Sequence, residues 1–185
     1  MIPTIEEAKE ILNKYVKKQE FINHNLEVGR AMKALAQYFG ENEDFWQTIG
    51  ILHDIDIEVY GEELENHTVE GEKILLSENV DQDVIDIIKS HNGEYVNQKR
   101  EALVEHCLYA ADGLTGLVHA YVLMRPDKDI QQAKTKSIMK KYKDKAFARG
   151  VNRGEIKSVE ATLKMEVRDF VEIVLEGMKK DIILQ

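Results

Sequence analysis

Residues 49–56 read IGILHDID, an apolar run that ends in an adjacent histidine and aspartate. Ile49, Ile51 and Leu52 are typical of a buried helix. Neighbouring side chains on a regular helix do not face the same way, so His53 and Asp54 can converge on one point only where the helix ends. The stretch therefore predicts a buried helix that carries a polar site at its C-terminus.

Upstream of this stretch the sequence repeats its apolar residues with the 3.6-residue period of a helix, and no segment alternates convincingly with the period of a strand. Thr4 and Glu7 form a capping box for a first helix. A second helix is expected over about residues 23–39, with Gly40 at its C-terminus. Asn42 can cap the helix that follows. These local signals all favour helices.

Downstream the same periodicity continues, and two prolines and eleven glycines in the chain favour long helices. The expected elements are a short helix capped by Asn66, one capped by Asp81, a polar loop over residues 92–100, a long helix over residues 101–124, a basic helix over residues 130–142, and a terminal helix capped by Asn152 that runs to Met178. The sequence predicts one all-α domain over residues 1–185.

The composition, 43% hydrophobic and 32% charged over 185 residues, is typical of a globular domain with its own core. The single cysteine, Cys107, excludes an intramolecular disulfide and is expected in the core. It suits a reducing compartment, and the acidic N-terminal segment is unlike a secretory leader, so we expect a cytoplasmic protein. A net charge of −9 disfavours nucleic acid as a partner, and no apolar run reaches the roughly 20 residues of a membrane span.

Charge is concentrated in one region, because residues 134–157 contain nine basic and two acidic residues. One interpretation is a solvated helix face, the usual place for such a run. The other is a flank that recognises an anion beside an active site. The charge pattern alone favours the solvated face.

Histidines and aspartates follow one another in an order that suggests a metal site. The candidate ligands are His24, His53, Asp54, His67, His91 and Asp112. Imidazole with carboxylate suits a divalent transition metal, namely Fe, Mn, Ni, Co or Zn, bound as one or two ions. His106 and His119 lie outside this series and are expected to be structural. Asp56 and Glu58 could orient His53, could accept protons or could be ordinary loop acids, and no catalytic role is assigned to them.

The order of these residues resembles the HD superfamily of metal-dependent phosphohydrolases, which carries a lone histidine, an adjacent His-Asp pair and a distant aspartate. IGILHDID is similar to the second motif of that family, and YAADGLTGL, residues 109–117, is similar to its last motif. The resemblance implies a compact helical bundle over about residues 20–126, followed by C-terminal helices over about residues 130–182.

The resemblance also implies the metal ligands. His24, His53, Asp54 and Asp112 would hold one ion, as in the family's lone histidine, His-Asp pair and last aspartate. His67 and His91 match the positions that complete a second site in the binuclear branch, with Asp54 bridging the two ions. His53 and Asp54 would then be catalytic as well.

Two further stretches refine the resemblance. KTKSIMKKYKDKAFARGVNR, residues 134–153, is similar to the C-terminal part of a group of small, poorly characterised HD hydrolases. This similarity gives a functional basic flank the same weight as a solvated helix face. Ile57 stands where some family nucleotidases have glutamate and the cyclic-dinucleotide phosphodiesterases have lysine. The segment from His91 to Tyr95 also lacks the motif of the cyclic-dinucleotide group, so that substrate is disfavoured.

The family resemblance implies hydrolysis of a phosphomonoester or phosphoanhydride by metal-activated hydroxide. The expected partner is a small, anionic, phosphate-containing substrate that is nucleotide-like. Candidate substrate contacts are Thr115, Arg125, Lys136, Lys140 and Lys141. The Thr115 hydroxyl could instead bond to its own helix.

Two other activities stay open at this point. A di-iron oxygenase of the HD type would use a similar cage of histidines and aspartates. A non-catalytic nucleotide-binding sensor is the third possibility, although retention of all six ligands counts against it. The sequence is compatible with a monomer or with a homodimer.

Overall fold

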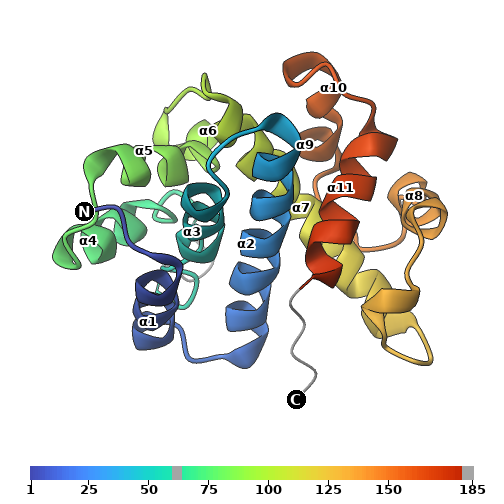
Figure 1. Cartoon of the computed structure of the whole chain (residues 1–185), viewed down its shortest axis with the longest axis horizontal. Coiled ribbons are helices and arrows are strands. Elements are labelled where there is room, and N and C mark those ends of the chain that lie inside the picture. Colours follow the sequence, from blue (N-terminus) through green and yellow to red (C-terminus); the bar gives the residue numbers. More distant parts are fainter. Residues whose placement is uncertain (60–63, 181–185) are drawn as a thin grey trace.

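The computed structural model describes residues 1–59 and 64–180, and over these ranges the chain forms helices and connecting turns with no strand (Figure 1). The α-helices are α1 (Ile5–Tyr15), α2 (Gln19–Phe39), α3 (Glu43–Leu52), α4 (Val69–Ser77), α5 (Gln82–Ser90), α6 (Gly93–Val96), α7 (Leu103–Met124), α8 (Thr135–Lys143), α9 (Arg153–Lys157), α10 (Val159–Thr162) and α11 (Val167–Lys179), with a 3-10 helix, η1 (Ile130–Gln132), before α8. The predicted all-α class is confirmed.

Helix boundaries follow the local signals closely in the first third of the chain. Thr4 and Glu7 form the predicted capping box of α1. Gly40 ends α2 with a φ of 74°, the left-handed conformation that glycine adopts without strain. The Asn42 side chain accepts a hydrogen bond from the Phe45 amide at 3.0 Å and so caps α3.

Helix α2 lies in the middle of the molecule, between α3 on one side and α11 on the other (Figure 1). It also packs against α7, and the four helices share a core in which Leu35, Ile49, Leu108 and Phe170 are fully buried. Four of the six candidate metal ligands belong to these helices: His24 lies in α2, Asp112 lies in α7, and His53 and Asp54 directly follow α3. The packing of the helices therefore brings distant parts of the sequence together.

Two glycines allow α2 and α3 to cross in direct contact. A Cβ atom at Gly50 of α3 would lie 2.8 Å from the Cα of Gly29 in α2, closer than real Cβ atoms come. His24 lies five residues before Gly29, and His53 lies three residues after Gly50. The close crossing therefore positions both histidines.

Helix α7 is long and apolar enough to cross a membrane by length and composition alone. The central helix of a globular bundle passes the same test, and α7 here packs against α2, α5, α8, α9 and α11. Leu114 and Leu117 are completely buried in that core. Packing within the bundle accounts for its apolar character.

Two predicted caps are wrong. Thr68, with a φ of 67°, precedes α4 in place of Asn66, whose carbonyl accepts bonds from the first amides. Asp81 precedes α5 as expected, but its side chain pairs with the amino group of Met1 and does not cap the helix. The residue 92–100 segment, expected to be a loop, contains the one-turn helix α6.

The C-terminal helices are shorter than the periodicity predicted. The basic helix expected over residues 130–142 is divided into η1 and α8. The terminal helix is capped by Asn152 as predicted, but it breaks into α9, α10 and α11, with Lys164 at a φ of 53° before α11. Since α9 and α10 pack on α7 whereas α11 packs mainly on α2, the chain has to turn between them. Residues 181–182 of the expected terminal segment lie outside the described residues.

Candidate metal centre

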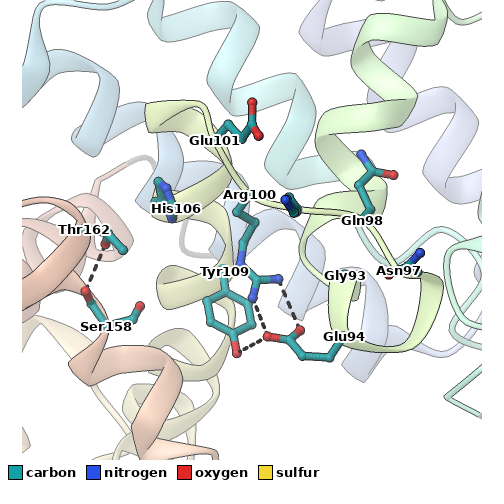
Figure 2. Close-up of a pocket in the computed structure, with 11 residues that line it drawn as sticks. Gly93, Glu94, Asn97, Gln98, Arg100, Glu101, His106, Tyr109, Ser158 and Thr162 are labelled. Carbon is teal, nitrogen blue, oxygen red and sulfur yellow. Dashed lines mark hydrogen bonds and ion pairs between the residues drawn. The ribbon is translucent and has the colours of Figure 1, made fainter.

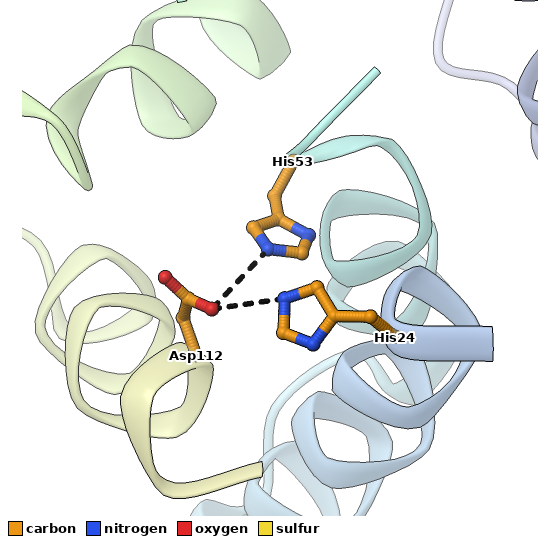
Figure 3. A group of neighbouring side chains, drawn as sticks. All are labelled: His24, His53 and Asp112. Atoms are coloured by element: carbon orange, nitrogen blue, oxygen red, sulfur yellow. Dashed lines mark ion pairs between the residues drawn. The ribbon is translucent and has the colours of Figure 1, made fainter. Parts of the chain in front are cut away.

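All six candidate ligands meet in the folded chain, in two neighbouring groups. Figure 3 shows the first group, in which His24, His53 and Asp112 point toward one another from α2, the end of α3 and α7. The Nε2 atom of His24 lies 3.0 Å from Oδ1 of Asp112, and the Nε2 atom of His53 lies 3.7 Å from the same oxygen. The second group contains Asp54, His67 and His91.

Asp54 joins the two groups. Its Oδ2 atom lies 3.8 Å from His24 Nε2, and its Oδ1 atom lies 3.7 Å from His53 Nε2. The same Oδ1 atom lies 3.2 Å from His67 Nε2 and 3.5 Å from His91 Nε2. A carboxylate placed in this way can bridge two ions, because its two oxygens have several lone pairs to offer.

Helix ends supply the geometry that lets neighbouring residues converge. Helix α3 ends at Leu52, His53 occupies its C-cap, and Asp54 follows in a turn, as the sequence predicts. His91 likewise caps the C-terminus of α5. The polypeptide leaves the helical path at these points, so the side chains of His53 and Asp54 can both face the cluster.

The backbone orients two of the imidazoles. Nδ1 of His53 lies 2.9 Å from the Gly50 carbonyl, and Nδ1 of His91 lies 2.5 Å from the Ile88 carbonyl. A carbonyl only accepts hydrogen bonds, so each Nδ1 donates and, in the neutral ring, Nε2 carries the free lone pair. Metal-binding histidines are commonly fixed in this way.

Asp56 performs the same task for His67. Its Oδ1 atom accepts a hydrogen bond from His67 Nδ1 at 2.9 Å, and its Oδ2 atom accepts the backbone N–H groups of Thr68 and Gly71. Of the roles that the sequence left open for Asp56, orientation of a histidine is right, but the histidine is His67. Glu58 points elsewhere and accepts the backbone N–H groups that precede α2.

The cluster is strongly coupled electrostatically. Burial by itself would lower the pKa of His24, but the hydrogen bond to Asp112 and the nearby carboxylates raise it to about 9. Burial acts in the same way on His67, whose bonds to Asp54 and Asp56 raise its pKa to about 10. Burial would raise the pKa of Asp54 and Asp112, yet the adjacent imidazoles hold both well below their usual range. Two ionised carboxylates this close together need positive charge beside them, which the charged imidazoles of His24 and His67 or a metal ion can supply.

The donor set fits a divalent transition metal. The side chain of His53 is fully buried, and its Nε2 atom has no hydrogen-bond partner, although it faces the cluster. A buried nitrogen with a free lone pair is costly unless something occupies the position in front of it. Imidazole nitrogens and carboxylate oxygens are the ligands that such ions take in proteins.

The remaining expected residues lie elsewhere. His106 and His119 belong to neither group, and His119 Nδ1 lies 3.0 Å from Oε1 of Glu27, which agrees with a structural role. Cys107 is fully buried, as predicted. Burial raises the pKa of its thiol to about 12.

The structure does not bring the predicted substrate contacts to the cluster. The Thr115 hydroxyl is buried and donates to the Asp112 carbonyl at 2.8 Å, the local bond that the sequence left open. Arg125 pairs with Asp127 at the end of α7, thirteen residues from Asp112, which is about 20 Å along a helix.

The predicted lysines also lie apart from the cluster. Lys136 and Lys140 line a separate cavity with Arg168, and Lys141 lies over the ring of Phe147. In Figure 1, α8 lies at the outer edge of the molecule, beyond α11 from α3 and α5. The predicted lysines of α8 therefore do not flank the metal centre, although Gly150, Asn152 and Glu155 of the same basic run line its cavity.

A cavity of about 480 Å³ opens beside the ligands. Its lining residues are Asp54, Leu64, His67, His91, Asn92, Glu94, Tyr95, Tyr109, Asp112, Gly150, Asn152 and Glu155. The sequence predicted Asn152 only as a helix cap and gave no site role to the other lining residues outside the ligand set. The only sequence signal for them was their proximity to the motifs, since Glu94 and Tyr95 follow His91 and Tyr109 precedes Asp112.

A second cavity, of about 520 Å³, lies on the other side of a wall formed by Glu94 and Tyr109. Figure 2 shows Arg100 packed against both residues. The Arg100 guanidinium lies 3.7 Å from the centre of the Tyr109 ring and pairs with Glu94, which also accepts a bond from the Tyr109 hydroxyl at 3.0 Å. Arg100 thus neutralises one of the acids at the metal-centre cavity.

Comparison with known proteins agrees with this geometry. The chain is similar to Ribonuclease Y of Thermotoga petrophila, with 33% identity over 97 residues, and to Ribonuclease Y of Thermosipho melanesiensis, with 33% identity over 101 residues. Each alignment covers 52% of this chain but 18% of the relative, so the chain spans less than a fifth of the length of these curated relatives. No solved structure matches the chain significantly.

The model of the HD domain family matches residues 21–117, about half of the chain. That range contains all six residues of the two His/Asp groups. The chain therefore belongs to the HD domain family, whose members are generally metal-dependent hydrolases.

Proposed function

We propose that this chain hydrolyses a phosphate monoester or phosphoanhydride of a small, nucleotide-like molecule. The observation that carries the proposal is the pair of His/Asp groups that share Asp54 and adjoin a cavity of about 480 Å³. A cavity of this size suits a small molecule. Divalent ions held there would supply hydroxide at neutral pH and neutralise charge on the phosphoryl oxygens.

Some residues of the site would bind the metal ions, and others orient the histidines that bind them. His24, His53 and Asp112 would hold one ion, and His67 and His91 the other, with Asp54 between them. The Gly50 and Ile88 carbonyls and the Asp56 carboxylate hold the imidazoles with Nε2 toward the centre. These bonds are already made in the protein, so the ligands need little reorganisation to bind.

Among the described residues that line the cavity, only the histidines can offer an anion positive charge. The described lining includes four carboxylates and no lysine or arginine. A phosphate group would be repelled there unless bound cations offset the carboxylates. Binding of inorganic phosphate should therefore be strongly enhanced by added metal.

A substrate panel with metal-depleted and metal-loaded protein tests the proposal. We expect release of inorganic phosphate from p-nitrophenyl phosphate or from nucleoside mono-, di- or triphosphates when Mn, Fe, Co, Ni or Zn is restored. The His106→Gln variant is the matched control, because His106 lies on α7 but belongs to neither ligand group. Since the curated relatives are named Ribonuclease Y, an RNA oligonucleotide belongs in the panel.

Three outcomes would contradict the proposal. Oxygen consumption by iron-loaded protein without phosphate release would indicate the oxygenase alternative. Nucleotide binding without turnover under every metal would indicate a sensor. Cleavage of RNA without release of phosphate from small molecules would move the substrate to a phosphodiester.

A further inference from the structure

We propose that Glu155 selects the part of the substrate that lies beyond the reacting phosphate. Its carboxylate would accept a hydrogen bond from a hydroxyl or amino group of that part and would disfavour a second phosphate there. The preferred substrate class is then a phosphate monoester of a hydroxylated, uncharged molecule such as a nucleoside. This inference rests on the proposed function, because it concerns the same cavity.

Glu155 reaches the metal centre from α9, which lies outside the matched residues 21–117. Gly113 follows the ligand Asp112 in α7, and a Cβ atom at Gly113 would lie 3.2 Å from Oε2 of Glu155. The missing side chain at Gly113 lets the carboxylate approach α7. Glu155 and Asp112 line the same cavity, and the unpartnered, buried Nε2 of His53 independently marks the adjoining cluster as a place for a ligand.

One oxygen of Glu155 is available to a ligand. Its Oε1 atom accepts a hydrogen bond from Asn152 Nδ2 at 2.9 Å, whereas Oε2 has no hydrogen bond from any residue that the structure describes. Glu94, the other lining acid outside the ligand groups, is bonded by Arg100 and by the Tyr109 hydroxyl. Glu155 is therefore the better acceptor for a substrate group.

The charges around Glu155 determine which substrate group it would accept. The nearest arginine at this wall, Arg100, is engaged by Glu94 and by the Ser90 carbonyl at 2.6 Å. A second phosphate beside Glu155 would face a carboxylate with no lining lysine or arginine to offset it. A hydroxyl or amino donor at the same position would instead gain a charge-assisted hydrogen bond.

Two large hydrophobic side chains also line the cavity. Leu64 and Tyr95 are 43% and 53% exposed, which is high for large hydrophobic residues. A flat, partly apolar group such as a nucleobase can cover such surface, and aromatic side chains bind it well. The lining thus combines an acceptor for hydroxyl groups with an apolar contact.

Calorimetric titration of Mn²⁺-loaded protein with inorganic phosphate and with non-hydrolysable phosphonate analogues of adenosine 5′-monophosphate and adenosine 5′-diphosphate tests this proposal without turnover. Burial, and then the negative charge of Asp112, raise the pKa of Glu155 to about 7. The titrations therefore belong at about pH 8.5, where the carboxylate is ionised. The variants are Glu155→Gln and Glu155→Ala, with Glu160→Gln as control, because Glu160 is an exposed acid of α10 that does not line the cavity.

We expect Glu155→Ala to weaken binding of the monophosphate about tenfold, the effect of losing one charge-assisted hydrogen bond, with inorganic phosphate unaffected. Glu155→Gln should raise the affinity for the diphosphate relative to the monophosphate by about tenfold, since it removes the like charge. The Glu160→Gln control should keep the wild-type ratio of monophosphate to phosphate affinity and the wild-type ratio of diphosphate to monophosphate affinity. A diphosphate preference that is unchanged in Glu155→Gln, or equal weakening of all three ligands in Glu155→Ala, would overturn the proposal.

The proposed function fails in a different way. If it is wrong, metal-loaded wild-type protein and the Glu160→Gln control both release no phosphate from any substrate. If the function is right and the role of Glu155 is wrong, both proteins turn over substrate and the three affinities keep their ratios in the Glu155 variants.

Discussion

Asp54 approaches more members of the cluster than any other residue. Its two oxygens lie within 4 Å of Nε2 of all four clustered histidines, at 3.2 to 3.8 Å. The amide of Asp54 also donates to Oδ1 of the buried Asn25 at 3.3 Å, which holds the turn against α2. Both ligand groups therefore depend on the charge and position of this single carboxylate.

We expect Asp54→Asn to lower metal affinity by more than the roughly 10- to 100-fold typical of removing a group that only orients a ligand. The amide keeps the shape of the carboxylate but loses its charge, which both groups share. Metal analysis after gel filtration, together with phosphate release, measures the effect. His106→Gln should keep wild-type metal content, and full metal content in Asp54→Asn would contradict the bridging position.

The ion pair between His119 and Glu27 gives a pH-dependent prediction. The hydrogen bond between His119 and Glu27 raises the pKa of His119 above the ordinary 6.5. The charged imidazole is thus favoured in the folded state, so the stabilisation is complete below about pH 6.5 and is lost as the pH rises through the raised pKa.

His119→Gln should therefore lower the free energy of unfolding in the acidic range and have less effect in the alkaline range. The His119 side chain is 38% exposed, so solvent screening limits the loss to about 1 kcal/mol or less. Urea unfolding of both proteins at about pH 6 and pH 9 measures it. If the difference in free energy of unfolding between wild type and His119→Gln increases with pH, the ion pair is not its cause.

At the scale of the helices, the crossing of α2 and α3 sets the distance between His24 and His53. The two rings lie with their centroids 5.2 Å apart, and both side chains reach Asp112 of α7. The approach is possible because Gly29 and Gly50 have no side chains at the crossing point. Packing of the helices and formation of the metal centre are thus coupled.

Gly50→Ala should destabilise the protein by about 1–3 kcal/mol, the usual effect of overpacking a core. The new methyl group would lie 2.8 Å from the backbone of Gly29, which has to move. Gly116→Ala is the matched control, since a Cβ atom there meets its nearest neighbour at 3.9 Å and alanine favours the helix by about 1 kcal/mol. The free energy of unfolding, measured with urea, and the metal content should both decrease for Gly50→Ala. Equal stability of the two variants would contradict the tight crossing.

At the scale of the whole molecule, the metal centre connects segments that are distant in the sequence. Its ligands come from α2, the end of α3, the turn before α4, the end of α5 and the middle of α7. A bound ion would hold all five segments together, and binding to the folded state alone stabilises that state.

Removal of metal should therefore lower the melting temperature. A free metal concentration of 100 times the dissociation constant stabilises the folded state by about 2.7 kcal/mol. This corresponds to a rise in melting temperature of roughly 5–10 °C for a chain of this size. Scanning calorimetry of metal-loaded protein before and after chelation measures the shift. An unchanged melting temperature in protein first shown to contain metal would contradict a ligand set drawn from five segments.

The sequence alone was sufficient for features that depend on neighbouring residues. The caps at Thr4, Asn42 and Asn152 were predicted correctly because each is a bond between residues two or three positions apart. The all-α class followed from periodicity, and the ligand set followed from motifs that keep their order along the chain. The helix end that lets His53 and Asp54 converge was also predicted from the sequence.

Tertiary structure decided what depends on packing between distant segments. The apolar stripe of the terminal region correctly marks Ile156, Phe170 and Met178 as buried, but the break into three helices arises because those helices pack on different partners. The orientation of His67 by Asp56 and the arrival of Glu155 beside Asp112 depend on how the chain returns to the cluster. The lysines of α8 lie apart from the metal centre for the same reason. Helical periodicity determines which face of a helix is apolar, and only the packing of the core determines which neighbour that face meets.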